Sequence, residues 1–210
     1  MALNGSRILL VFGEALTCPE VAWSLMNAGC EVTALFRKGS SSASRMVRSL
    51  GMIEVTSPEE SSDGCIAELA GVLETNDFDG VMPLDDPGLF VISGLDPASC
   101  KVLGAEGLQA EIALDKRIQF EMAEESGFSV PAWTAWPDLD RRGGVVPSQD
   151  EAVIVKPALA GSSEDGRFTR GSASIEPSME VAVDRLEQEK CSHPVLIQSL
   201  VNPNGRFQAF

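Results

Sequence analysis

Residues 8–12 read Ile8-Leu9-Leu10-Val11-Phe12, and Gly13 follows them directly. A run of five apolar, β-favouring residues that ends at a glycine is typical of a strand buried on both faces of a sheet. After this run, apolar residues recur every three to four positions over 17–28, which predicts a helix. A second apolar run at 31–36 predicts another buried strand. The beginning of the chain therefore predicts a strand–helix–strand unit.

The same alternation continues to about residue 104. It predicts helices near 42–50 and 64–75 and strands at 52–55, 80–83 and 101–103. Short connections between alternating strands and helices require parallel strands joined by right-handed helical crossovers. We therefore expect an α/β fold in which residues 1–104 form a Rossmann-like open parallel sheet. The first turn, 13–16, lacks the G-x-G-x-x-G pattern, which argues against a dinucleotide site there.

Beyond residue 104 the pattern changes. Asp115 is a good helix N-cap, and Gly127 with Pro131 ends the helix that it begins, so 105–150 are expected to form a helical connector and an exposed linker. Residues 151–210 are expected to form an α+β unit. There the sequence predicts a strand at 152–156 that pairs with 167–170 across a flexible loop, a helix at 177–190, a strand at 194–201, a turn at 202–205 and the start of a strand at 206–210.

The composition is that of a globular protein with a strong negative charge. Of 210 residues, 44% are hydrophobic, and 31 acidic against 16 basic residues give a net charge of −15. This charge repels nucleic acid and anionic membranes. The five cysteines form no C-x-x-C pair, which argues against a disulfide framework or a zinc site. The apolar run near the N-terminus is too short for a signal sequence or a membrane span, so we expect a cytoplasmic protein. The sequence leaves the oligomeric state open, a homo-oligomer included.

Lys156 is the first candidate for chemistry. It ends an apolar strand, and Pro157 and the small-residue loop 160–166 follow it. The N–H groups of a glycine–serine loop and a lysine ammonium can together bind a phosphate. The order differs from that of the P-loop, where the lysine follows the loop. Taken alone, the pattern also fits a solvated lysine before an ordinary hairpin loop.

Three further passages join this one. They are Val81-Met82-Pro83-Leu84-Asp85-Asp86, then Ala113-Leu114-Asp115-Lys116-Arg117 with Gly127-Phe128-Ser129-Val130-Pro131-Ala132, and finally 194–201 with Asn204-Gly205-Arg206. In this order, and with 153–157 and 161–163 between them, they resemble the ATP-grasp superfamily of carboxylate–amine and carboxylate–thiol ligases. The resemblance spans nearly the whole chain. It implies a pre-ATP-grasp domain at 1–104, the connector at 105–150, and at 151–210 the small ATP-grasp lobe with the start of a truncated large lobe.

The resemblance assigns the phosphates of ATP to two lysines and one loop. It implies that Lys116 and Lys156 contact the phosphates from two sides. It also implies that the loop with Gly161, Ser162 and Ser163 folds over the β- and γ-phosphates. The same loop carries Glu164 and Asp165, whose charges oppose a phosphate unless they point outward.

The resemblance places the adenine ring near 198–200. It implies that Gln198 accepts a hydrogen bond from the adenine amino group and that backbone atoms of Leu200 lie near the ring. The family usually has an acid at the position of Gln198, but an amide oxygen can accept the same hydrogen bond.

The implied activity of the parent protein is ATP-dependent ligation, with ATP and Mg²⁺ as cofactors and a small carboxylate as substrate. ATP phosphorylates the carboxylate, and an amine or another nucleophile then displaces phosphate. The family places its metal-binding carboxylates on a larger lobe that would begin at Arg206. We therefore expect this chain to be an N-terminal fragment that is inactive alone.

Two other functions remain open at the level of sequence. Gln198 and the acidic loop also fit a non-catalytic nucleotide-binding or regulatory module. A Rossmann-type oxidoreductase is a third reading, against which the missing glycine pattern counts. Asp85 and Asp86, at the end of the strand at 80–83, either face a ligand at the sheet's carboxyl edge or cap the following turn.

Overall fold

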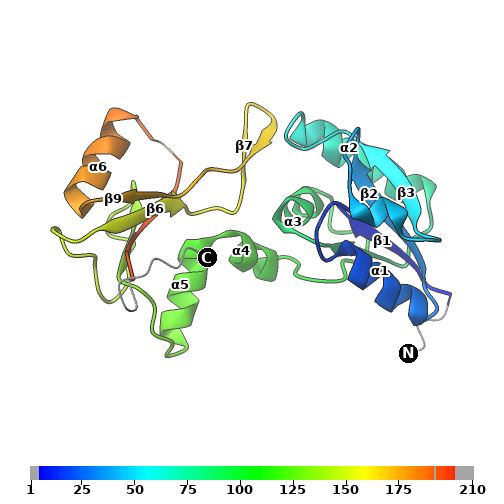
Figure 1. Cartoon of the computed structure of the whole chain (residues 1–210), viewed down its shortest axis with the longest axis horizontal. Coiled ribbons are helices and arrows are strands. Elements are labelled where there is room, and N and C mark those ends of the chain that lie inside the picture. The colour runs from blue at the N-terminus through cyan, green and yellow to red at the C-terminus, as the bar shows by residue number, and fades with distance from the viewer. Residues whose placement is uncertain (1–4, 192, 202–210) are drawn as a thin grey trace. The chain divides into compact units, whose positions relative to one another are not determined.

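The computed structural model describes residues 5–191 and 193–201, which divide into two compact units (Figure 1). The first unit comprises Met1–Leu114 and Gly161–Thr169, and the second comprises Asp115–Ala160 and Arg170–Phe210. The expected turn at 202–205 and strand start at 206–210 lie outside the described residues.

The first unit is built on a parallel sheet. Its strands are β1 (Arg7–Val11), β2 (Glu31–Arg37), β3 (Gly51–Val55) and β4 (Gly80–Pro83), in the order β3-β2-β1-β4. Its helices are α1 (Cys18–Asn27), α2 (Ser62–Thr75), α3 (Asp86–Ser93) and α4 (Leu108–Leu114). Leu9 and Val11 belong to a core cluster with residues of α2 and α3, whereas Ile8 and Leu10 belong to one with residues of α1. Both faces of β1 are thus buried, and the predicted α/β class with a parallel sheet is confirmed.

Two elements of the first unit are shorter in the structure than the sequence predicts. The helix expected at 42–50 is a single 3-10 turn, η1 (Ala43–Met46), because the Ser42 side chain accepts a hydrogen bond from the Ser44 N–H and Val47 leaves the helical region with ψ at 116°. The strand expected at 101–103 is one parallel bridge between Val81 and Val102.

Asp85 caps α3. Its carboxylate accepts a hydrogen bond from the Gly88 N–H at 2.9 Å, and Pro87 occupies the first turn, where its missing N–H costs nothing. Of the two roles left open by the sequence, the structure shows the cap.

The second unit is an antiparallel sheet with a helix on each face. Its strands are β5 (Trp133–Trp136), β6 (Val153–Pro157), β9 (Ser174–Glu176) and β10 (Val195–Ser199), in the order β5-β10-β6-β9. Val153 and Val155 pack with residues of α6 (Met179–Gln188). On the other face, Trp133 and Leu196 pack with Phe120 of α5 (Lys116–Glu125). The sequence did not predict β5, which lies in a passage interpreted as helical or irregular.

The predicted pairing of 152–156 with 167–170 is wrong. The partner of β6 at its outer edge is β9, and the small-residue loop folds into its own hairpin, β7 (Ser162–Glu164) and β8 (Arg167–Thr169). The reason is the turn between them: Asp165 and Gly166 have φ of 49° and 73°. Two successive positive φ angles at an Asp-Gly pair are the geometry of a type I′ hairpin turn.

The five cysteines form no disulfide in the structure. Cys18, Cys30 and Cys65 are buried, and Cys100 and Cys191 are partly exposed. Burial raises the pKa of the Cys65 thiol to about 12, so this residue is a neutral core side chain at neutral pH. No described helix combines the length and the apolar composition that a bilayer span requires.

We predict that Asp85→Ala lowers the free energy of unfolding by about 1 kcal/mol, because the Gly88 N–H loses its acceptor at the start of α3. Asp85→Asn is the matched control, since its amide oxygen can still accept that hydrogen bond. Urea denaturation followed by circular dichroism measures both variants. Equal stability of Asp85→Ala and the wild type would contradict the cap.

Candidate functional site

Lys156 and Gln198 lie on the same face of the second unit's sheet. In the antiparallel register Lys156 is opposite Leu196, and Gln198 is opposite both Ile154 and Trp133. Residues directly opposite each other in a sheet share a face. This is the face that α5 covers, and the Lys156 ammonium lies 5.1 Å from the centre of the Phe120 ring of α5.

The start of α5 is joined to the end of β6. Asp115 and Leu159 form an antiparallel bridge, and the Lys116 N–H donates to the Ala158 carbonyl at 2.8 Å. The Lys116 ammonium donates to the Pro157 carbonyl at 3.1 Å. These bonds hold Lys116 beside the strand that carries Lys156, although the two lysines are far apart in sequence.

The two lysines repel each other. Burial, and next the positive charge of Lys116, lower the pKa of Lys156. No carboxylate among residues 5–191 and 193–201 forms an ion pair with Lys156. Two ammonium groups held close together in a partly buried place favour an anion between or beside them.

Asp115 belongs to the scaffold of this site. Its carboxylate accepts hydrogen bonds from the Arg117 backbone N–H at 2.8 Å and from the Arg117 guanidinium at 2.6 Å. Burial alone would raise the pKa of Asp115, but the bonds from Arg117 lower it. A negative charge fixed at the N-cap of α5 stabilises the helix start that presents Lys116.

Gln198 brings a buried acceptor to the same face. The residue is 9% exposed, and its amide oxygen Oε1 has no hydrogen-bond partner in the part of the chain that the structure describes. An unsatisfied buried acceptor is costly, and such groups in native proteins call for an explanation. A ligand N–H donor would satisfy it.

Leu200 does not offer its N–H to a ligand. This group donates to the Ala152 carbonyl at 3.0 Å, and the neighbouring Ser199 N–H donates to the Ala132 carbonyl at 2.8 Å. The Leu200 carbonyl and side chain are therefore the groups left for a ring to contact.

The three loop candidates lie in the first unit, on the β7–β8 hairpin. A Cβ at Gly161 would overlap the ring of Phe168, so this position requires glycine. The Ser162 and Thr169 hydroxyls are 3.2 Å apart across the hairpin, and the Ser163 hydroxyl is 3.0 Å from that of Ser62. Glu164 and Asp165 are exposed at the turn. The seven candidates are thus four in the second unit and three in the first.

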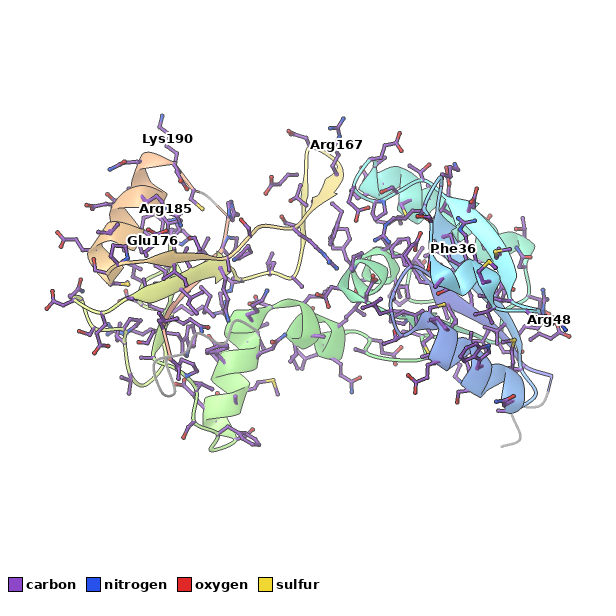
Figure 2. All side chains as sticks on the ribbon, in the orientation of Figure 1. Phe36, Arg48, Arg167, Glu176, Arg185 and Lys190 are labelled. Carbon is purple, nitrogen blue, oxygen red and sulfur yellow. The ribbon has the colours of Figure 1, made fainter. Side chains whose placement is uncertain are left out.

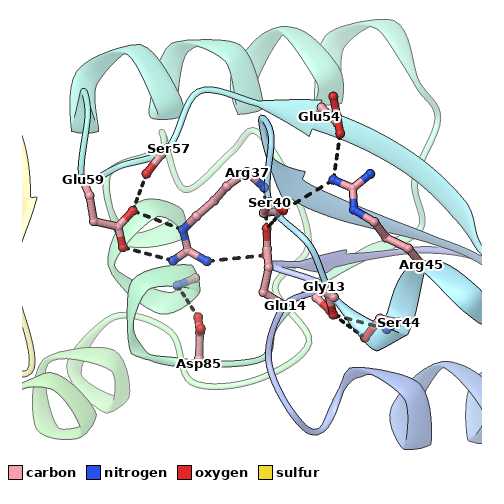
Figure 3. Close-up of polar contacts among 12 residues, drawn as sticks. Gly13, Glu14, Arg37, Ser40, Ser44, Arg45, Glu54, Ser57, Glu59 and Asp85 are labelled. Atoms are coloured by element: carbon pink, nitrogen blue, oxygen red, sulfur yellow. Dashed lines mark hydrogen bonds and ion pairs between the residues drawn. The ribbon is translucent and has the colours of Figure 1, made fainter.

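The carboxyl edge of the parallel sheet carries a second cluster of charges. Figure 3 shows Arg37, at the end of β2, between Glu14 and Glu59. The Arg37 guanidinium donates to Glu14 at 3.4 Å and to Glu59 at 3.1 Å and stacks over the Phe12 ring at 4.0 Å. The Glu14 carboxylate also accepts from the Arg37 backbone N–H at 2.7 Å. The charges of this cluster are largely satisfied internally.

Comparison with known proteins relates this arrangement to solved structures. No protein-family model matches the chain, and no curated protein matches it in sequence. N5-carboxyaminoimidazole synthetase from Staphylococcus aureus matches with 13% identity and a TM-score of 0.60, over 96% of this chain and 48% of that chain. L-amino acid ligase from Bacillus licheniformis matches with 15% identity and a TM-score of 0.59, over 93% and 46%. Both are ATP-grasp enzymes, matched through their N-terminal portions. The chain has the fold of the N-terminal portions of these enzymes.

A third ATP-grasp structure also matches the chain. The biotin carboxylase domain of the Hydrogenobacter thermophilus 2-oxoglutarate carboxylase, solved with MgADP, ADP and bicarbonate, matches with 15% identity and a TM-score of 0.56, over 92% of this chain and 44% of that chain. The chain therefore spans about half the length of the ATP-grasp enzymes that it matches.

The residues present on this face fit a nucleotide. Lys116 and Lys156 supply positive charge for phosphates, and the unpartnered oxygen of Gln198 suits an exocyclic amino group. The described residues do not offer a comparable site for Mg²⁺. They contain no group of three or more His, Cys, Asp or Glu side chains able to hold a metal ion.

Sequence reasoning missed two residues of this face. Phe120 lies under the Lys156 ammonium and meets Trp133 edge to face, with ring centres 5.9 Å apart. Trp133 is fully buried on the missed strand β5. The aromatic residues Trp133 and Trp136 with the β-branched Thr134 were the available signal for that strand.

We predict that Gln198→Leu raises the free energy of unfolding of the nucleotide-free protein by about 1 kcal/mol, because it removes a buried acceptor without a partner. Gln188→Leu, at the exposed end of α6, is the matched control and is expected to change little. Urea denaturation compares the two. A Gln198→Leu variant less stable than the control would show that Gln198 is already satisfied.

Proposed function

We propose that this chain is the N-terminal part of an ATP-dependent carboxylate–amine ligase and that its second unit binds ATP. One observation carries the proposal: Lys116 and Lys156 are held together on the sheet face that also presents the unpartnered oxygen of Gln198. The matched solved structures, which include a complex with MgADP, support it. In this proposal 1–104 are the pre-ATP-grasp domain, 105–150 the connector, and 151–210 the small lobe with the start of a large one.

Each candidate residue has a defined part in binding. The ammonium groups of Lys116 and Lys156 neutralise phosphate oxygens, which relieves their mutual repulsion. The Gln198 oxygen accepts a hydrogen bond from the adenine amino group, and the Leu200 carbonyl and side chain contact the ring. For Gly161, Ser162 and Ser163, contact with the β- and γ-phosphates stays a prediction from the resemblance.

The proposed chemistry of the whole ligase has two steps. A substrate carboxylate oxygen attacks the γ-phosphorus of ATP, which releases ADP and forms an acyl phosphate. An amine nitrogen then attacks the acyl carbon, phosphate leaves with the electrons of the broken C–O bond, and the amine loses a proton. Bound Mg²⁺ neutralises the charge on the phosphates in such transfers. Because the described residues hold no metal cluster, we propose that its ligands lie elsewhere in the parent protein and that this chain alone does not turn over.

Two other functions are weighed against this one. A non-catalytic nucleotide-binding module is favoured by the amide at Gln198 and by the exposed Glu164 and Asp165 on the hairpin. An oxidoreductase is disfavoured because Glu14 places a carboxylate at the first turn of the parallel sheet, where it would repel a pyrophosphate. The net charge of −15 supports small-molecule partners over nucleic acid or anionic membranes, and we propose a cytoplasmic location.

We predict that Lys156→Gln weakens ATP binding by about 10-fold or more, because a charged contact to phosphate is lost. Adenosine, which has no phosphates, is expected to bind the variant and the wild type equally. Isothermal titration calorimetry with the 210-residue chain measures both ligands.

The matched control is Lys190→Gln, an exposed lysine after α6 in the same unit. It makes the same change in net charge and is expected to leave ATP affinity unchanged. If both variants weaken ATP binding equally, the effect is one of overall charge, and the site is not at Lys156.

We predict that the complete parent protein releases ADP and phosphate from ATP when both a suitable carboxylic acid and an amine are present. Hydroxylamine in place of the amine is expected to trap the acyl phosphate as a hydroxamate. A coupled ADP assay over a panel of small acids checks this. ATP binding without ADP release for any acid would favour the non-catalytic module.

A further inference from the structure

A cavity of about 570 Å³ lies within the first unit. Three segments line it: the end of α3 with the turn that follows, Val102, and the stretch that contains α4. Figure 2 draws both helices with their side chains. Cavities that bind small molecules in proteins have volumes of about 300 to 1,000 Å³. This cavity is therefore large enough for a small ligand.

The walls of the cavity are mainly apolar. Ile92 and Leu95 line it from the end of α3 and the turn after it, and Ala110 and Leu114 line it from α4. Ile92, Leu95 and Ala110 are buried, and Ile92 and Leu95 belong to a core cluster against which Val102 also packs. Core packing thus fixes these walls, and an apolar ligand placed between them would be removed from water.

The charges around the cavity are all negative. Its ionisable lining residues are Glu106 and Glu111, which are both exposed, so they stand at its opening. The lining, all of it described, includes no Lys, Arg or His; Lys101 precedes Val102 in sequence but does not line the cavity. Neither glutamate forms an ion pair within residues 5–191 and 193–201. Two unpaired carboxylates favour a cationic group at the opening.

The end of α3 adds to this preference. The last carbonyl groups of a helix carry partial negative charge, which a basic side chain in the last turn often offsets. The last turn of α3, all of it described, contains no basic residue. The Ser93 hydroxyl in this turn donates to the Leu89 carbonyl at 2.8 Å, so its proton is already used. This wall of the cavity therefore favours a hydrogen-bond donor or a cation over an anion.

We propose that this cavity binds a small apolar amine, a ligand with a hydrocarbon or aromatic body and one ammonium group. The body packs against Ile92, Leu95 and Leu114, and the ammonium group lies near the carboxylates of Glu106 and Glu111. A carboxylic acid of the same shape is repelled by these carboxylates, and an alcohol lacks the ionic attraction. The inference does not rest on the proposed nucleotide site, because no lining residue belongs to that site.

The test titrates the 210-residue chain with benzylamine, benzyl alcohol and benzoate, which share one aromatic body and differ in charge. Methyl NMR signals locate binding: Ile92 reports the cavity, and the fully buried Ile197 of β10 is the control. Benzylamine is expected to shift the Ile92 signal alone and to bind about 3- to 10-fold more tightly than benzyl alcohol at low salt. This preference is expected to fall as salt is added, and benzoate is expected not to shift Ile92.

A double variant tests the two carboxylates. Glu106→Gln with Glu111→Gln is expected to lower benzylamine affinity to that of benzyl alcohol and to leave benzyl alcohol unchanged. Glu20→Gln with Glu74→Gln is the matched control, because it makes the same change in net charge on exposed side chains of α1 and α2 outside the lining. The control is expected to bind all three compounds as the wild type does. Circular dichroism checks that both double variants are folded.

Several results would overturn the proposal. They are equal binding of the three compounds, equal losses in the two double variants, shifts of Ile197 in place of Ile92, and no shift at the highest soluble benzylamine concentration. Ile92 shifts that depend on protein concentration, without any added compound, would show that a second copy of the chain covers the cavity. That result would also overturn the proposal.

Discussion

The second unit depends on the junction where the N-terminus of α5 meets the end of β6. Hydrogen bonds from the Lys116 backbone and side chain to the carbonyls of Ala158 and Pro157 fix this junction. They place the Lys116 ammonium near that of Lys156, whose pKa is lowered first by burial and then by this positive charge. An anion bound near the two ammonium groups would reduce their repulsion. Unfavourable charge arrangements of this kind are common at binding sites.

The same face combines this charge with an apolar surface. Phe120 lies under the Lys156 ammonium, and Trp133 is the cross-strand neighbour of Gln198. The two aromatic rings also contact each other, so the polar groups of this face lie beside packed aromatic side chains. The cluster around Arg37 in the other unit has the opposite character, since Glu14 and Glu59 neutralise it. A charge already paired with carboxylates stabilises local structure, whereas Lys156, which forms no ion pair with a carboxylate of the described residues, is available to a ligand.

The sequence predicted the parallel sheet well, because residues 8–12 must be apolar on both faces of a central strand and short connections then force the topology. It also placed Lys116 and Lys156 correctly at a helix start and at a strand end. The sequence-based prediction failed where two local patterns favoured different strand pairings. The hairpin turn at Asp165-Gly166 is a strong local signal, and it overrode the expected pairing of β8 with β6. Contacts such as that of Ser62 with Ser163 leave no periodic trace in a sequence, so no pattern could predict them.

Because the β7–β8 hairpin belongs to the first unit, both units are discontinuous in sequence. The polypeptide passes between the two units three times, after Leu114, after Ala160 and after Thr169. Neither unit is a continuous stretch of sequence, so one cut at any of these crossings leaves two other covalent connections in place. Residues 1–114 made alone would lack Phe168, whose ring centre lies 4.9 Å from that of Phe90, and would expose the Phe90 ring. A chimera that exchanged either unit at a single breakpoint would separate the hairpin from the helices that hold it.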